Sequence, residues 1–559
     1  MRKTIVSLLL SAAMCAALLS GCGSSSNEVQ GETNQTVDSA NTENVAAGST
    51  VKNLDGTSVV VGIADDPASL APWVANNGGR IGILPSIYQT LIQTESLGSE
   101  MTGVLMESWE QVDDVTYKMK IYDYIYDTAG NHLTAADVAF SYNTAKEQGN
   151  LNKLNEVKSV TAIDDYNIEF VFGQKLMAGQ LETLWSEAFV VTQAAYEASD
   201  DGMAVDPVGT CNYEVTQYVP GATVTLSKTD KYWQTNEALT MQMYKANVDN
   251  IEFDIITDAN QMATALKTGA IDMTNTVDSV DLPSFQEGGE YADNFTAFQI
   301  MANNTYMLQF NCDESAPTGN ENLRMAIAYG IDVDQIIKTV FGGNAFKVHG
   351  YGNEKYGDYN KAWDKESYFD FDLEKAQEYL AAFEKETGIK ASDLNLRLIV
   401  KEAARANDQD VMQIIQGYLL ALGINSEIIN QSVNNYVSFM SEPSAWEITM
   451  SSENAASSNY LIVWWENQMN PSYFNWGGTF GFVFDDKLTE LINAAKTPEG
   501  HTTENMDTLQ SYMNEHIYNY GMVGFYENVV AANWVTSVYT EFRIQILPGG
   551  CEYNWDAKK

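Results

Sequence analysis

The chain has 559 residues, and its content of 45% hydrophobic and 11% aromatic residues is typical of a folded globular protein. A single hydrophobic core does not grow to this size, so we expect at least two structural lobes. Acidic residues outnumber basic residues by 75 to 31. The resulting formal net charge of −44 argues against nucleic acid as a partner, because phosphate binding requires a basic surface.

The first 21 residues have the organisation of a secretion signal, in which Arg2 and Lys3 precede a mostly apolar run. The run ends in Leu-Ser-Gly-Cys, which has the form of a bacterial lipobox. This resemblance implies cleavage before Cys22 and a lipid anchor on its sulfur, where two acyl chains suffice for stable anchoring. A stray cysteine after an ordinary signal peptide is the alternative. Residues 22–50 are too polar to fold, so we predict a disordered tether with a reach of roughly 30 Å.

After the tether, residues 57–63 predict a strand and residues 81–91 a helix. Apolar and polar residues alternate over residues 115–121, which indicates a half-buried strand. A helix should begin after Thr134, because Asp137 can reach back to the Thr134 amide. A later helix is expected to begin after Asp258 and to end at Gly269.

The second half of the chain predicts an α/β lobe, which a strand over residues 304–310 enters. Asp332 should cap a helix, and Arg324, on the helix before it, is expected to form a salt bridge rather than a ligand contact. Residues 394–400, a helix capped by Asp408 and residues 424–429 form a β-α-β unit, which implies parallel strands and a right-handed crossover. No stretch after the signal reaches the roughly 18 apolar residues that a membrane helix needs.

Chemistry-bearing motifs are scarce, and we predict no catalytic residue, no metal and no cofactor. No GxSxG, HExxH, Walker A or GxGxxG motif occurs, and the histidines lack metal-ligand spacing. We interpret the acidic pairs as turn or cap residues, although a secreted carboxylate-dependent hydrolase stays open. The three cysteines of the mature body are expected to be buried and structural. These residues are Asp65, Asp113, Asp164 and Asp485, which begin the pairs; His132, His349, His501 and His516; and Cys211, Cys312 and Cys551.

Several segments, in the same order, resemble the family 5 extracellular solute-binding proteins, the oligopeptide, dipeptide and nickel receptors of ABC importers. The resemblance spans about residues 55–550 and departs at Cys211 and Asn212, where the family has Gly and Pro. The matching segments are residues 105–110 (LMESWE), 117–120 (YKMK), 133–141 (LTAADVAFS), 207–213 (PVGTCNY), 230–233 (DKYW), 265–272 (ALKTGAID), 322–332 (NLRMAIAYGID) and 485–492 (DDKLTELI).

The resemblance implies an α/β, two-lobed periplasmic-binding-protein-like (Venus-flytrap, type II) fold with an extra subdomain in the first lobe. The first lobe would then be discontinuous in sequence, and hinge strands would close the lobes over a ligand. We expect the following division: signal peptide 1–21, lipidated Cys22 and tether 22–50, first lobe 51–95, 205–303 and 515–559, subdomain 96–204 and second lobe 304–514.

The implied function is capture of an extracellular solute, most simply an oligopeptide, and its delivery to an ABC permease in the membrane. The receptor would be a monomer, lipid-anchored through Cys22 and facing the extracytoplasmic side. A sensory receptor shares the fold and differs in its membrane partner. Receptors that hold a free peptide amino terminus carry an Asp in a Trp-rich segment, yet no Asp occurs between Thr449 and Phe484. An oligosaccharide is therefore the alternative ligand.

Two segments supply the expected ligand-binding residues. Asn and Gly at residues 76–78 occupy the place where the resembling receptors run a loop beside the ligand, although any surface turn would favour the same residues. The aromatic segment after residue 450 offers flat rings next to amides, which suit sugar rings or apolar side chains, with core packing as the alternative. The candidates are Asn76, Asn77, Gly78, Trp464, Trp465, Tyr473, Asn475 and Trp476.

Overall fold

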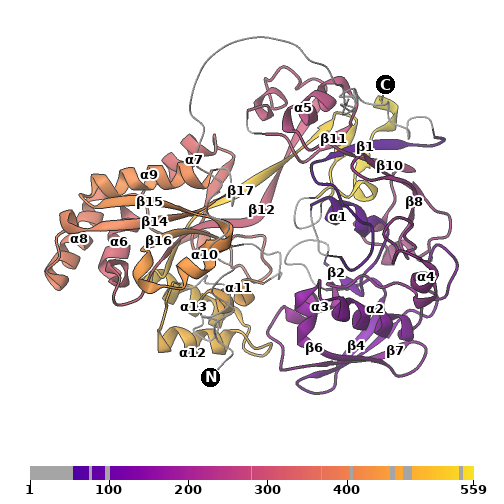
Figure 1. The fold of residues 1–559 in the computed structure, drawn as a ribbon, viewed down its shortest axis with the longest axis horizontal. Coiled ribbons are helices and arrows are strands. Elements are labelled where there is room, and N and C mark those ends of the chain that lie inside the picture. Colours follow the sequence, from indigo (N-terminus) through magenta and orange to yellow (C-terminus); the bar gives the residue numbers. More distant parts are fainter. Residues whose placement is uncertain are drawn as a thin grey trace, which may run out of the picture. The chain divides into compact units, whose positions relative to one another are not determined.

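A computed structural model describes residues 54–74, 78–94, 101–278, 280–366, 368–402, 407–453, 460–469, 481–540 and 545–558. Its main structural unit is an 11-stranded sheet, in which strands far apart in sequence lie side by side (Figure 1). In sheet order its strands are β15 (Asn425–Gln431), β14 (Asn395–Lys401), β16 (Ile448–Glu453), β12 (Phe295–Phe310), β17 (Asn519–Ala532), β11 (Met273–Thr274), β1 (Ser58–Ile63), β10 (Asn250–Ile255), β9 (Thr223–Lys228) and β8 (Tyr213–Val219), with β13 (Ala345–Lys347) beside β17.

The β1 end of the sheet confirms the local predictions for the first lobe. β1 is almost wholly buried because it pairs in parallel with β10 and β11, and such strands are covered on both faces. The helix α5 (Ala259–Thr268) begins where predicted, since Asp258 accepts a 2.9 Å hydrogen bond from the Gln261 amide. It ends at Gly269, whose φ of 71° is the left-handed conformation that glycine adopts without strain.

A second sheet forms the subdomain drawn in purple in Figure 1. Its antiparallel order is β4 (Met106–Gln111), β5 (Thr116–Ile121), β7 (Asn167–Phe172) and β6 (Val157–Ala162). β5 is the predicted half-buried strand, with Tyr117, Met119 and Ile121 in the core. The helix α2 (Ala135–Gln148) begins as predicted, because the Asp137 carboxylate accepts a 2.7 Å hydrogen bond from the Thr134 amide.

Two predicted elements have different bounds in the structure. The helix expected over residues 81–91 is α1 (Gly78–Ile83), followed by a 3-10 turn at Leu84–Ser86, because Pro85 disfavours an α-helical residue before it. The strand expected over residues 304–310 begins nine residues earlier, at Phe295, because β12 pairs antiparallel with β17 from Phe295 to Gln309. The pairing partner is distant in sequence, which a local pattern does not reveal.

The other end of the sheet carries the predicted β-α-β unit. β14 and β15 are parallel, and α9 (Asp408–Ala421) connects them. The cap prediction was wrong by one residue, since Asn407 occupies the N-cap position and Asp408 begins the helix. The remaining helices are α3 (Gln180–Trp185), α4 (Gln193–Ala198), α6 (Glu321–Tyr329), α7 (Val333–Val340), α8 (Leu373–Thr387), α10 (Val433–Met440), α11 (Leu461–Met469), α12 (Asp486–Ala495) and α13 (Thr503–His516). Two further antiparallel pairs join β2 (Ile92–Gln93) with β3 (Thr102–Gly103) and β18 (Val535–Ser537) with β19 (Glu552–Tyr553).

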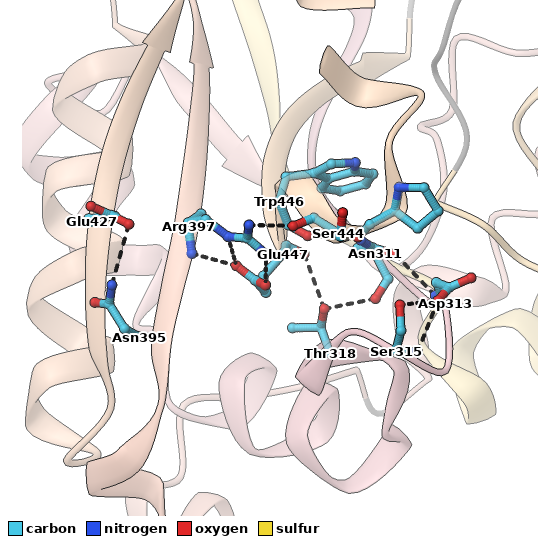
Figure 2. A network of polar contacts seen from close by, with 11 residues as sticks. Asn311, Asp313, Ser315, Thr318, Asn395, Arg397, Glu427, Ser444, Trp446 and Glu447 are labelled. Atoms are coloured by element: carbon cyan, nitrogen blue, oxygen red, sulfur yellow. Dashed lines mark hydrogen bonds and ion pairs between the residues drawn. The ribbon is translucent and has the colours of Figure 1, made fainter. Parts of the chain in front are cut away.

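A buried polar network fixes β12 where it ends (Figure 2). The Glu447 carboxylate, only 3% exposed, accepts hydrogen bonds from the Arg397 amide at 2.7 Å and from its guanidinium. The Asn311 side chain donates to the Trp446 carbonyl at 2.8 Å, and the Thr318 hydroxyl donates to the Asn311 carbonyl at 2.7 Å. The network therefore joins the ends of β12, β14 and β16.

The salt bridge predicted for Arg324 is replaced by another arrangement. The guanidinium is buried and donates to the carbonyls of Thr318, Gly319, His516 and Ile517, at 2.8 to 2.9 Å. Main-chain oxygens at the end of α13 need donors, and Arg324 supplies them. Arg324 thus connects α6 to the end of α13, just before the chain enters β17.

The acidic pairs serve turns and caps, as predicted. Asp113 and Asp164 each accept hydrogen bonds from amides two and three residues ahead, and these bonds lower the pKa of both carboxyls. Asp485 caps α12 through a 2.8 Å bond from the Leu488 amide, and Asp66, the partner of Asp65, accepts one from the Ala68 amide. These contacts are those of local structure.

The cysteine prediction is confirmed for Cys211 and Cys551, which are buried free thiols. Cys312 is also a free thiol, but it is only partly buried, so the prediction of burial was wrong for this residue. Burial raises the pKa of Cys211 to about 12 and that of Cys551 to about 11, because an apolar environment disfavours the thiolate. Within the described ranges, no helix combines the length and apolar character needed to cross a membrane.

Candidate functional site

A pocket of about 740 Å³ lies beside the two long strands β12 and β17. Asn275 directly follows β11, which pairs with β17, and Asn407 lies at the start of α9, which connects β14 to β15; both residues line the pocket. β11 runs parallel to β1, and β14, which precedes α9, runs parallel to β15 and β16. The pocket therefore lies where the carboxyl ends of parallel strands meet, which is the usual place for ligands in α/β sheets.

A break in strand register points side chains of β12 into this pocket. Met301 pairs with Tyr526, but the next pair is Thr305 with Gly524, so the residues between them bulge. Bulges redirect side chains and occur often beside functional sites. Asn304 lies in the bulge and lines the pocket, and its Oδ1 atom is buried with no hydrogen-bond partner among the described residues.

Asn528 on β17 repeats this feature on the neighbouring strand. It pairs with Gln299 and lines the same pocket, and its buried Oδ1 also lacks a partner within the described ranges. An unpaired buried acceptor costs about 1–3 kcal/mol, so a donor supplied by a bound molecule would recover that energy. These two amides are hence candidates for ligand contacts.

Further amides of the pocket are held in place by the protein. The Gln299 side chain donates to Asn344 Oδ1 at 2.9 Å, and Asn344 Nδ2 donates to the Tyr526 carbonyl at 3.0 Å. The turn that carries Asn344 follows α7 and contains Gly342 and Gly343, both in the left-handed region with φ of 57° and 85°. This turn is therefore fixed against β17.

Aromatic rings form one wall of the pocket. Tyr306 and Phe525 meet edge to face with centroids 4.4 Å apart, and Phe341 packs on Phe525 at 5.2 Å. Such rings give a rigid surface for apolar groups or for the flat face of a sugar. Glu527 is the single charged side chain in the described lining. The arrangement therefore suits a neutral or cationic solute that is rich in hydrogen-bond donors.

Most of the residues predicted from sequence to bind ligand lie outside the described residues, namely Asn76, Asn77, Tyr473, Asn475 and Trp476, as does the predicted lipid acceptor Cys22. Gly78 begins α1. Their roles stay predictions. None of the predicted ligand-binding residues that the structure describes lines the pocket beside β12 and β17.

Trp464 and Trp465 both lie on α11 but differ in environment. Trp465 is 1% exposed, and its Nε1 donates to the Tyr351 carbonyl at 2.8 Å, so this tryptophan is placed as a core side chain. Trp464 is half-buried, and its Nε1 finds no partner in the described chain. Of the two, Trp464 keeps a free donor that a ligand could use.

The residues that line the pocket were missed by sequence reasoning, although two signals were present. β12 contains the polar pair Asn303 and Asn304 within a mostly apolar strand, and β17 contains Glu527 and Asn528 in the same way. Polar side chains within a long buried strand are costly unless they serve a purpose. Neither signal alone shows that the two strands are neighbours.

No group of three or more His, Cys, Asp or Glu side chains suited to a metal ion occurs among the described residues. The candidate site is lined mainly by amides and aromatic rings, groups that can bind and orient a solute through hydrogen bonds and surface contact.

The fold defines a class, the two-lobed type II periplasmic binding proteins with a mixed α/β sheet. The sequence profile of the bacterial extracellular solute-binding proteins, family 5, middle region, matches residues 100–481. The chain belongs to this family, whose members serve ABC importers. The family resemblance inferred from short segments is thereby confirmed.

Known relatives are similar over most of their length. The oligopeptide-binding protein OppA of Bacillus subtilis is 23% identical over 68% of this chain and 72% of its own. The nickel-binding protein NikA of Staphylococcus aureus is 23% identical over 83% of this chain and 87% of its own. The structure of HbpA2 from Haemophilus parasuis superposes with a TM-score of 0.76 at 16% identity and covers 89% of this chain and 99% of that one.

Proposed function

We propose that this protein is a lipid-anchored receptor that captures an extracellular oligopeptide and delivers it to an ABC permease in the membrane. The observation that carries the proposal is the amide-lined pocket beside β12 and β17 in a family 5 fold. Peptides present main-chain N–H donors at regular spacing, and the unpaired oxygens of Asn304 and Asn528 accept such donors. The bound, closed form would then dock on the permease as a monomer.

An oligosaccharide is the second candidate ligand for the same pocket. The observation that favours it is the wall of Tyr306, Phe341 and Phe525 next to amides, because sugar rings stack on aromatic faces and their hydroxyls bond to amides. The absence of an Asp between Thr449 and Phe484 also removes the usual anchor for a free peptide amino terminus. The two ligand classes are separated by experiment.

Thermal unfolding of the purified protein with a pool of short peptides, or with a set of oligosaccharides, tests both candidates. A solute at a hundred times its Kd should stabilise the protein by about 2.7 kcal/mol. We expect Asn304→Ala and Asn528→Ala each to reduce that stabilisation, because each removes an acceptor from the pocket.

Asn533→Ala is the matched control, since Asn533 is an exposed amide just beyond β17 and outside the pocket lining. This variant should keep the full shift. Equal solute-induced stabilisation of the pocket variants and the control would show that the pocket does not bind the solute. No shift with either set of solutes would contradict the proposed function, and turnover of a solute would favour the carboxylate-dependent hydrolase instead.

A further inference from the structure

A loop of the subdomain touches the region of α11, α12 and α13, which is distant in sequence. We define the latch loop as residues 175–179, between β7 and α3, and the receiver as residues 496–501, between α12 and α13, together with Tyr460. The Ala178 amide donates a 2.9 Å hydrogen bond to the Lys496 carbonyl. Met177 and Ala178 also pack against the hydrophobic cluster that α11, α12 and α13 form.

Close approach at Gly179 makes the contact specific. A Cβ atom at this position would lie 2.2 Å from Cδ2 of the Tyr460 ring, a distance that no real contact allows. The φ of Gly179 is 78°, which glycine adopts without strain. Tyr460 in turn packs edge to face on His501, with centroids 5.4 Å apart. The ring is therefore clamped between the latch loop and the receiver.

The receiver is itself held firmly. The Asp358 carboxylate accepts hydrogen bonds from the Leu461 and Ile462 amides at 2.7 and 3.1 Å, and His501 Nε2 lies 3.6 Å from the same carboxylate. Lys496 pairs at 2.7 Å with Glu466, which is 1% exposed. The latch loop thus meets a rigid surface, so the contact is either made or broken as a unit.

Charge contributes little to this contact. Lys175 and Glu499 form an ion pair of 2.9 Å across it, but their side chains are 37% and 68% exposed, and exposed pairs contribute at most about 1 kcal/mol. Burial raises the pKa of Glu182, on α3 behind the loop, and the neighbouring His501 opposes that rise. The Gly179–Tyr460 contact and the main-chain hydrogen bond therefore carry most of the specificity.

We propose that the latch loop is a closure latch, which stabilises the solute-enclosing conformation from a place remote from the solute. The latch loop and the receiver share no residue with the described lining of the pocket beside β12 and β17. They nevertheless connect the subdomain to α11, α12 and α13, so closing over a solute and closing the latch would be one movement. The role that we assign to the latch rests on the proposed solute-binding function, but the contact itself can be tested without a solute.

Gly179→Ala tests the latch, with Gly149→Ala as the matched control. Both glycines have positive φ, 78° and 71°, so both variants carry the same backbone strain, but a Cβ at Gly149 meets nothing within 4 Å. Small-angle X-ray scattering of the purified protein in buffer should give a larger radius of gyration for Gly179→Ala than for the wild type and the control. Tyr460→Ala, which removes the ring without adding a clash, should give the same increase.

The short-peptide pool gives a second readout with the same variants. Peptide dissociation should be at least about fivefold faster in Gly179→Ala than in Gly149→Ala. A fivefold change is the lower end of the range by which coupling between two linked sites alters affinity. Equal radii of gyration in Gly179→Ala, Tyr460→Ala and Gly149→Ala would overturn the latch. If the wild type binds no peptide, the proposed ligand is wrong, while the scattering comparison in buffer still decides on the latch.

Discussion

At the level of single residues, Arg324 joins parts of the chain that are far apart in sequence, through its hydrogen bonds to Thr318 and Ile517. Its guanidinium holds the carbonyl of Ile517, a β-branched residue whose φ of 43° lies in the left-handed region. Such a conformation costs about 1–3 kcal/mol and persists only where the surroundings enforce it. Arg324 therefore fixes the direction in which the chain leaves α13 and enters β17.

We expect Arg324→Met to lower the free energy of unfolding by about 3 kcal/mol, because buried carbonyls lose their donors. Urea denaturation followed by circular dichroism measures the change. Lys338→Met is the control, since Lys338 lies on the exposed side of α7 and its replacement should change stability by less than about 0.5 kcal/mol. A loss no greater in Arg324→Met than in the control would show that Arg324 has no such role.

At the scale of elements, β1 is tied to its neighbour β10 by a carboxylate as well as by strand pairing. Asp249 Oδ2 accepts hydrogen bonds of 2.7 Å from both the amide and the hydroxyl of Thr57. These bonds, above all that from the Thr57 amide, lower the pKa of Asp249, because they favour the charged form. The element at the centre of the first lobe thus depends on the ionised carboxylate.

Asp249→Asn tests this dependence through pH. A carboxyl with a lowered folded-state pKa contributes stability that is present above its unfolded pKa of about 3.9 and is lost as pH falls through the folded value. We expect the variant to be less stable than the wild type by about 1–2 kcal/mol at pH 7. The gap should narrow as the pH is lowered below 4, which urea denaturation at several pH values measures. A gap that stays constant with pH would contradict this role.

Elements set by neighbouring residues could be predicted from sequence, whereas those set by distant partners could not. The caps at Asp137 and Asp258 are local bonds within four residues, so the sequence pattern is sufficient. The start of β12 at Phe295 depends on pairing with Ala532. The candidate pocket depends in the same way on the bulge at Asn304, which is defined by its register against β17. The family resemblance was sufficient to predict the fold class. The pocket residues could be identified only once the pairing of β12 with β17 was known.

At the scale of the whole molecule, the lipid anchor proposed at Cys22 determines where the receptor works. Cys22→Ser should abolish incorporation of radiolabelled palmitate and shift the protein from the membrane pellet to the soluble fraction, because serine lacks the thiol that would carry the lipid. Cys15→Ser, which alters the apolar run and keeps the lipobox, should leave the protein in the membrane. Unchanged membrane association of Cys22→Ser would refute the anchor.

The position of β17 in the main sheet sets the order in which the chain can fold. β17 is near the carboxyl terminus, yet it lies between β12 and β11 and pairs with both. During secretion, all the other strands of the main sheet therefore emerge before β17, which joins the two parts of the sheet. Until β17 emerges, β11 and β12 each have an unpaired edge. Long-range pairing of this kind is slow, and open strand edges invite aggregation. A chain truncated before residue 519 would retain more than nine-tenths of the sequence. Its main sheet would nevertheless be divided into two separate parts, because β17 is the strand that connects them.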